Sequence, residues 1–251
     1  MSKKPRTPDP PRKVQAPKVR HRPEQAGGGF AMPGTNVLIG VGLLGIVALA
    51  VALIVVLTGS GGSGGGDVTA AAAAKVRTAM TAAGCTLTSE PADGSQQHMS
   101  DPDQRVTYKT FPAASGVHNP TTSIWGNYRL PVDPRQAIHN LEHGGIAIWY
   151  GPDISTGDRE ALDTFYDEDP NGLIISPLED PRPRVTYPKH EKLGGKIALT
   201  VWTSDTKTGD GTVYIAVCPS FDETAFATFR DTFRGRGPER FPISQMVPGG
   251  T

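Results

Sequence analysis

Several signals that identify common enzyme classes are missing from this sequence. It has no G-x-S-x-G elbow between a strand and a helix, which argues against a serine hydrolase, and no G-x-x-x-x-G-K-[ST] phosphate loop. Its only two cysteines, Cys85 and Cys218, are too far apart for a C-x-x-C redox pair or a typical zinc site. The net charge is zero, and the acidic excess after Asp67 gives no electrostatic reason to expect nucleic-acid binding.

Charge is also absent from residues 37–57, which contain no strongly polar side chain either. A helix of 21 residues would span the hydrocarbon core of a bilayer, which is about 30 Å thick. Basic residues flank this run only on its N-terminal side, so that side is expected to stay in the cytoplasm. A cleaved signal peptide is the alternative, but its apolar stretch would be shorter, about 7–15 residues. The sequence therefore predicts a single-pass protein of the plasma membrane, with the lipid bilayer as a partner.

The composition divides the chain into four parts. Residues 1–36 are rich in Pro, Lys and Arg and predict a disordered cytoplasmic tail before the transmembrane helix at 37–57. Residues 58–67 are mostly Gly and Ser and predict a flexible linker. Residues 68–251 are then expected to form one extracytoplasmic globular domain.

Helical and strand patterns are interspersed in this domain without a regular βαβ alternation. They predict an α+β fold with a mixed or antiparallel sheet and several helices. The expected helices cover residues 69–83, 134–143 and 158–167, and a last helix begins at Ser220. Segments rich in β-branched and aromatic residues predict strands at 104–111, 146–150, 173–176, 196–203 and 212–218.

The two cysteines fall in the domain that is expected outside the cytoplasm. An oxidising compartment favours a disulfide between Cys85 and Cys218. Closing so long a loop would stabilise the fold by several kcal/mol on the chain-entropy model. Two buried free thiols are the alternative.

Four of the six histidines lie between His98 and His143. On the expected helix 134–143, His139 and His143 are four residues apart and project from one face, so both imidazoles can reach one metal ion. His118, from a loop, would be a third ligand, and His98 or Met99 a fourth. Glu142 would then hydrogen-bond one of these ligands and orient it. Alternatively the histidines are structural, because a histidine at a helix end often caps the helix.

Imidazole and thioether groups, without a cluster of carboxylates, suit copper better than calcium or magnesium. A copper ion is therefore the expected cofactor, with zinc as the second choice. The segment from His139 to His143 also matches H-x-x-E-H, in which two histidines hold zinc and the glutamate acts as a base. That motif normally lies in a long helix, whereas Gly144 and Gly145 follow here at once, so a zinc hydrolase is the weaker prediction.

Several short segments resemble, in order, a bacterial family known as domain of unknown function 3105. These segments are Pro112-Ala113-Ala114-Ser115-Gly116-Val117-His118, Gly126-Asn127-Tyr128, His139-Asn140-Leu141-Glu142-His143-Gly144, Ile175-Ser176-Pro177, Ala198-Leu199-Thr200-Val201-Trp202 and Gly237-Pro238-Glu239. Val117 departs from the family pattern, in which proline is common at that position. The resemblance implies a short cytoplasmic N-terminus, one anchor and one exported domain, and it implies no particular reaction.

Two functions follow from these observations. The first is a membrane-anchored, extracytoplasmic metal-binding protein. The second is a non-catalytic accessory subunit of a membrane complex, such as a respiratory one, in which the histidines would be structural. Neither function requires the protein to be an enzyme.

Overall fold

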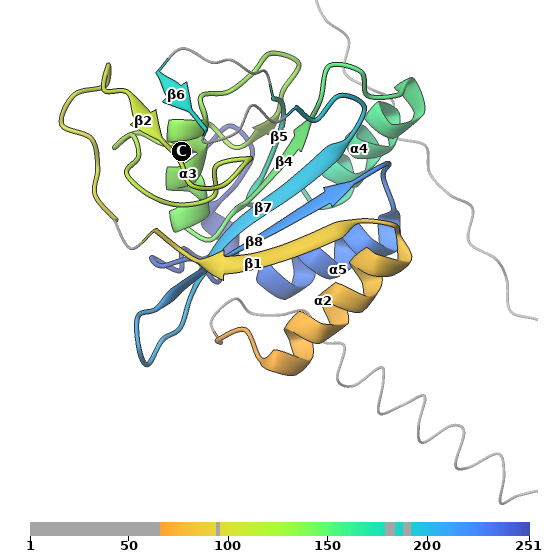
Figure 1. Cartoon of the computed structure of the whole chain (residues 1–251), viewed down its shortest axis with the longest axis horizontal. Helices are drawn as coiled ribbons and strands as arrows, with labels where there is room; N and C mark the ends of the chain where they lie inside the picture. Colours follow the sequence, from red (N-terminus) through yellow and green to blue (C-terminus); the bar gives the residue numbers. More distant parts are fainter. Residues whose placement is uncertain (1–65, 94–95, 179–183, 188–191) are drawn as a thin grey trace, which may run out of the picture. The chain divides into compact units, whose positions relative to one another are not determined.

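The computed structural model describes residues 66–93, 96–178, 184–187 and 192–251 (Figure 1). The expected tail, transmembrane helix and most of the linker, at residues 1–65, lie outside the described residues. Among the helices of the described ranges, none combines the length and the hydropathy that crossing a bilayer requires.

A six-stranded mixed sheet forms the centre of the fold (Figure 1). In spatial order its strands are β1 (Thr86–Pro91), β8 (Gly211–Cys218), β7 (Ile197–Ser204), β4 (Ile146–Tyr150), β5 (Leu173–Pro177) and β3 (Gly126–Asn127). The pairs from β1 to β4 are antiparallel, whereas β5 pairs in parallel with both β4 and β3. A separate parallel pair consists of β2 (Val106–Thr107) and β6 (Val185–Thr186). The expected α+β class with a mixed sheet is confirmed.

Helices cover both faces of this sheet. Side chains alternate between the two faces along each strand, so each buried strand contributes to both cores. In β4, Ile146 and Ile148 face a core that includes side chains from α2 (Ala70–Ala82), α4 (Thr156–Glu168) and α5 (Glu223–Phe233). Ala147 and Trp149 face the opposite core, which is covered by α3 (Pro134–Glu142) and the loops around it. A short 3₁₀ helix, η1 (Ile243–Gln245), follows α5. The predicted site lies on the α3 side of the sheet, since His139 belongs to α3 and His118 packs against Trp202 of the same core.

Two of the predicted elements differ from the structure. The last helix begins at Glu223 rather than at Ser220, because the side chain of Asp222 accepts a hydrogen bond from Ala225 N (2.8 Å) and caps the helix there. The prediction of a strand over 104–111 was too long. Only Val106–Thr107 forms a strand there, and it pairs with the equally short β6. Strand β1 was not predicted, because it is a largely exposed edge strand and lacks the hydrophobic alternation of a half-buried one.

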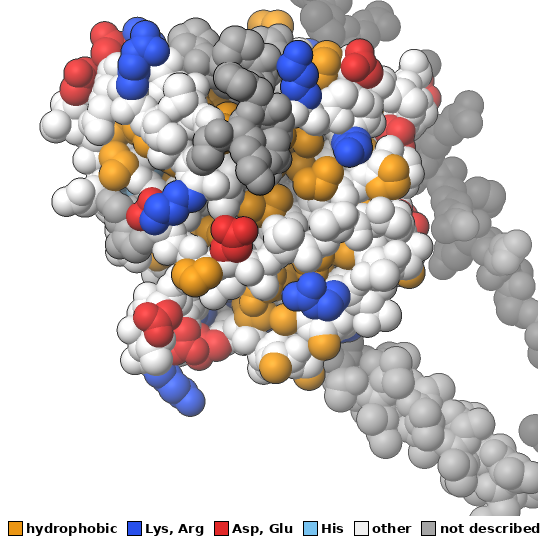
Figure 2. Space-filling model, viewed as in Figure 1, with side chains coloured by type: hydrophobic (Ala, Val, Ile, Leu, Met, Phe, Trp, Pro, Cys, Tyr) orange, Lys and Arg blue, Asp and Glu red, His pale blue; other side chains and the backbone are white. Residues whose placement is uncertain are grey.

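Charged side chains of both signs are intermixed on the face shown in Figure 2. Lys and Arg lie beside Asp and Glu, with hydrophobic side chains between them. Among the described residues, this face shows no extended area of a single charge sign.

Cys85 and Cys218 form a disulfide, as predicted, between residues 133 apart in sequence. Cys85 directly precedes the edge strand β1, and Cys218 ends β8, the strand that β1 pairs with. The bond therefore closes a loop that contains most of the domain.

We expect the variant Cys85→Ser/Cys218→Ser to be less stable by about 2–5 kcal/mol, because the unfolded chain regains the entropy of that loop. Thermal unfolding of the purified protein with and without reductant measures this effect. Reductant should lower the melting temperature of the wild type to that of the variant and leave the variant unchanged. Equal melting temperatures for the oxidised wild type and the variant would contradict the prediction.

Candidate functional site: a histidine and glutamate cluster

Helix α3 supplies two of the clustered side chains, and its own sequence fixes where it begins and ends. Asp133 caps the N-terminus by accepting a hydrogen bond from Arg135 N (2.9 Å), and Pro134 occupies the first helical position. Gly144 has φ +97°, a conformation that favours glycine, and ends the helix. A side chain at Gly145 would collide with the ring of Trp125, so glycine is required at this position, directly before the buried strand β4.

Polar side chains of α3 hold the neighbouring loops in place. The guanidinium of Arg135, which is 3% exposed, donates to Pro102 O and Gln104 O at 2.8 and 3.0 Å. The buried amide of Asn140 accepts from Ser123 N and donates to Ser123 O, both at 2.8 Å. The segments after His98 and after His118 are therefore pinned to the helix that carries His139.

The segments of His98 and His118 also bind each other through their backbones. Met99 N donates to His118 O (2.8 Å), and His118 N donates to Gln97 O (3.2 Å), as in a parallel β-bridge. Successive side chains in extended backbone point to opposite sides. Because His98 faces the cluster, the buried side chain of Met99 is expected to face away from it.

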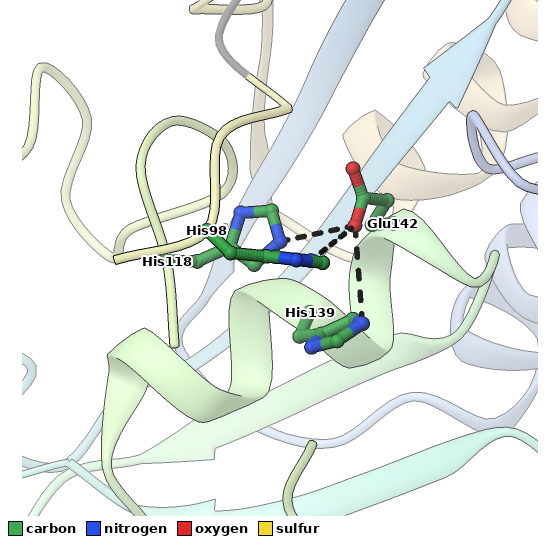
Figure 3. A group of neighbouring side chains, drawn as sticks. All are labelled: His98, His118, His139 and Glu142. Atoms are coloured by element: carbon green, nitrogen blue, oxygen red, sulfur yellow. Dashed lines mark hydrogen bonds and ion pairs between the residues drawn. The ribbon is translucent and has the colours of Figure 1, made fainter. Parts of the chain in front are cut away.

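Three imidazoles surround the carboxylate of Glu142 (Figure 3). Its Oε2 lies 3.0 Å from His118 Nε2, 3.6 Å from His98 Nε2 and 4.0 Å from His139 Nε2. One ligand atom from each of the four side chains lies within 4.8 Å of all the others. The side chains of His118 and Glu142 are 0% and 2% exposed, whereas that of His98 is 43% exposed. We call these four residues the inner group.

Backbone carbonyls determine which nitrogen of two histidines carries a proton. His118 Nδ1 lies 2.7 Å from Gly116 O, and His139 Nδ1 lies 2.9 Å from Asn119 O. A carbonyl can only accept, so both Nδ1 atoms must donate. Both Nε2 atoms then face Glu142, which is the arrangement typical of histidines that bind a metal through Nε2.

A second, outer group shares His139 with the inner group and adds His143 and Glu239. His143 Nε2 lies 3.0 Å from Glu239 Oε2, and the rings of His139 and His143 are 4.6 Å apart between centroids. The ring of Phe241 stacks on His143 at 4.2 Å. The outer group thus lies next to the inner one, at the C-terminal end of α3.

The structure brings together His98, His118 and His139. Glu142 was expected to orient one of these ligands from outside the site, but its carboxylate lies among the three imidazoles. It places His143 in the outer group, where it faces Glu239. Glu239 was not selected from the sequence as a site residue, because it is 96 positions from His143 and no local motif links them. Only its place in the Gly237-Pro238-Glu239 segment of the family resemblance could have suggested it.

Burial and neighbouring charge shift the pKa values of these groups. Burial lowers the pKa of His139, and the nearby His118 and His98 lower it further, against the opposing bond to Asn119 O. Burial and the proximity of His139 likewise lower the pKa of His143. For Glu142, burial alone would raise the pKa, but the hydrogen bond from His118 and the three nearby imidazoles hold it below its ordinary value.

The fold and this cluster together define an α+β protein with a candidate metal centre on one face of a mixed sheet. A family model described as "Protein of unknown function (DUF3105)" matches residues 98–241, more than half of the chain, and the chain belongs to that family. The matched region begins at His98 and ends at Phe241, so it contains the inner and outer groups completely. No curated protein and no solved structure matches the chain.

The lowered pKa values of His139 and His143 predict how the metal-free protein responds to acid. An unfolded histidine takes up a proton near pH 6.5, whereas these two resist it in the fold, so acidification favours unfolding. The unfolding free energy should therefore fall between about pH 7 and pH 5. The lowered pKa of Glu142 adds a stabilising contribution above the ordinary carboxylate pKa that is lost as pH falls through the lowered value.

Denaturant unfolding at several pH values, with a chelator present, measures this dependence. In His139→Gln the unfolding free energy should change less between pH 5 and pH 7 than in the wild type, because one of the two histidines with a lowered pKa is gone. A wild-type unfolding free energy that is constant or increases on acidification over this range would contradict the prediction.

Proposed function

We propose that this protein is a membrane-anchored, extracytoplasmic metal-binding protein that holds one transition-metal ion in the inner group. His98, His118 and His139 would each bind the ion through Nε2, and Glu142 through Oε2. The observation that carries this proposal is that two buried histidines commit Nδ1 to backbone carbonyls while both Nε2 atoms face one buried carboxylate. Metal-binding histidines are held in this way.

A purely structural role accounts for only part of this geometry. A single hydrogen bond joins the inner side chains to Glu142, namely that from His118 at 3.0 Å. The Nε2 atoms of His98 and His139 lie 3.6 and 4.0 Å from Glu142 Oε2, too far for a hydrogen bond, yet both face it. A cation among these four atoms would give each of them a partner and would neutralise the buried carboxylate.

The donor set favours Cu(II) over Zn(II), and both over Cu(I). Copper was predicted partly from the thioether of Met99, which is expected to face away from the cluster, so the soft ligand that suits Cu(I) is not available there. Three imidazoles and one carboxylate suit divalent copper and zinc, and a site of a given composition binds Cu(II) more tightly than Zn(II).

The position of the domain outside the cytoplasm is part of the same proposal. It rests on the apolar, uncharged residues 37–57 and the basic residues before them. The Cys85–Cys218 disulfide supports it, because such bonds persist in oxidising compartments. A reporter enzyme that is active only outside the cytoplasm, fused after Thr251, should be active, and an inactive but expressed fusion would reject this orientation.

A zinc hydrolase is the second candidate function. The observation that favours it is that Glu239 lies beside His139 and His143. With His139 and His143 it completes two histidines and a distant acidic ligand around an H-x-x-E-H segment. The catalytic base of such a site would be Glu142. Its carboxylate, however, is buried and already accepts a hydrogen bond from His118, so it is poorly placed to take a proton from water.

Calorimetric titration of the metal-free protein with Cu(II) and Zn(II) tests the proposal. We expect one tightly bound ion per chain, with Cu(II) tighter than Zn(II). In His139→Ala the affinity should fall by more than about 100-fold, since loss of a ligand should exceed the 10–100-fold cost of losing a supporting contact. Met99→Leu is the matched control, and it should bind as the wild type does. If the wild type bound no metal, the alternative hypothesis of a non-catalytic accessory subunit with structural histidines would be favoured instead.

The same titration should release about one proton per ion at neutral pH, because a proton must lie between His118 Nε2 and Glu142 Oε2 before the ion replaces it. Repeating it in buffers with different ionisation enthalpies measures that number. In Glu142→Gln the amide donates to His118 instead, so proton release should fall towards zero. Wild-type binding without proton release would contradict the assignment of this pair as ligands.

A further inference from the structure

The outer group is more accessible than the inner one. The side chains of His143 and Glu239 are 12% and 41% exposed, compared with 9% or less for His118, His139 and Glu142. In the inner group only His98 is comparably exposed, at 43%. An ion from solvent can therefore meet exposed ligands at two places, at His98 in the inner group and at the His143–Glu239 pair in the outer group.

His139 belongs to both groups but has only one nitrogen to offer. Its Nδ1 donates to Asn119 O, so Nε2 is the single lone pair available to a metal. One Nε2 cannot bind two ions at once in the two groups. When His139 binds an ion in the inner group, it cannot bind a second ion in the outer group. His139 can therefore serve only one of the two groups at a time.

Glu239 is held over His143 by the loop at residues 235–241. Glu239 N donates to Glu142 O (3.0 Å), Phe241 N to His143 O (3.0 Å) and Gly235 N to Gly144 O (2.7 Å). These bonds satisfy carbonyls that the end of α3 leaves free. At Gly237 a side chain would collide with Gly144 N and Glu142 O, so only glycine permits this close approach.

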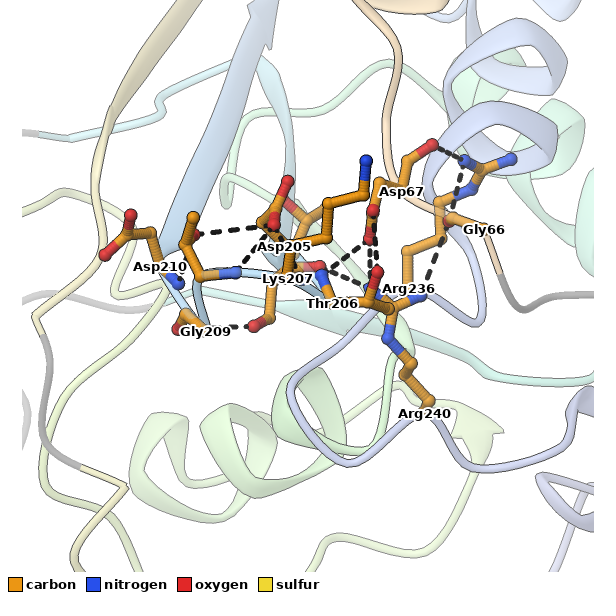
Figure 4. Close-up of polar contacts among 12 residues, drawn as sticks. Gly66, Asp67, Asp205, Thr206, Lys207, Gly209, Asp210, Arg236 and Arg240 are labelled. Atoms are coloured by element: carbon orange, nitrogen blue, oxygen red, sulfur yellow. Dashed lines mark hydrogen bonds and ion pairs between the residues drawn. The ribbon is translucent and has the colours of Figure 1, made fainter.

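The same loop is also held by Asp67, the last residue of the predicted linker (Figure 4). Arg236 donates to Asp67 O (2.7 Å), and Arg240 donates to the carboxylate of Asp67 (2.8 Å). Thr206, in the turn between β7 and β8, donates to that carboxylate through its backbone N (2.7 Å). Glu239, between the two arginines in sequence, is thus part of a fixed segment rather than a free surface side chain.

We infer that His143 and Glu239 form an outer metal station through which an ion reaches and leaves the inner group, with His139 passing it between the two. This inference rests on the proposed function. The step is an exchange of ligands without oxidation or reduction. The bonds from the ion to His143 Nε2 and Glu239 Oε2 break, its bond to His139 Nε2 is kept, and new bonds form to His98, His118 and Glu142, which releases the proton between the last two.

Stopped-flow transfer of Zn(II) from a coloured chelator complex to the metal-free, full-length protein tests this route. In Glu239→Gln we expect transfer to slow by about tenfold or more, because one of the two ligands that first hold the ion is lost. The equilibrium affinity of the inner group should stay close to that of the wild type. His143→Gln should behave alike. The control Glu168→Gln removes the same charge at an exposed position of α4 and should transfer at the wild-type rate.

Ionic strength distinguishes ligation from simple attraction, because salt screens long-range attraction but not a direct bond to the ion. The defect of Glu239→Gln should therefore persist at high salt. Wild-type transfer rates in both Glu239→Gln and His143→Gln, with one ion still bound, would overturn the outer station and leave the inner site intact. Two ions bound at once, the second lost in His143→Gln, would also overturn it. A wild type that binds no ion would instead reject the proposed function.

Discussion

The carboxylate of Glu142 is the group on which the rest of the site depends. It is almost completely buried and lies at the C-terminal end of α3, where the helix dipole is unfavourable to an anion. A buried charge in such a place needs compensation from cationic groups or a metal. In the metal-free protein His118 provides part of it through a hydrogen bond, whereas the Nε2 atoms of His98 and His139 lie 3.6 and 4.0 Å from the carboxylate without one. Histidines from three separate segments converge on this carboxylate with their Nε2 atoms facing it.

Helix α3, which carries Glu142, is held in place by the sheet and by several neighbouring loops. Strands β4 and β7 bury its apolar face, and Arg135 and Asn140 hold the loops that bring His98 and His118. The loop at 235–241 closes the end of the helix and carries Glu239. Because that loop also binds Asp67, the point where the domain begins is connected through two arginines to the outer edge of the site. The side chains of the site therefore come from segments that hydrogen bonds hold to α3 and to one another.

Local patterns predicted much of the fold. The β4 strand, the buried β7 and β8 strands and helix α3 with its Asp133 cap follow from residues that lie next to one another in sequence. The disulfide was also predicted, and all four histidines of the inner and outer groups were candidate ligands. The central position of Glu142 and the separation of His143 were not predicted, because they depend on which way α3 turns against the sheet. Glu239 and the edge strand β1 depend on pairing between distant segments, for which single-sequence patterns carry little signal.

The central claim is that these side chains bind one ion directly, so the most direct measurement is X-ray absorption spectroscopy of the protein loaded with one equivalent of Zn(II). The account predicts three imidazole nitrogens and one carboxylate oxygen at about 2.0–2.2 Å, with the multiple-scattering signal of histidine rings. Glu142→Gln should lose the short oxygen contribution or exchange it for water while the imidazole signal remains. A spectrum with one imidazole or none around the ion would contradict the account.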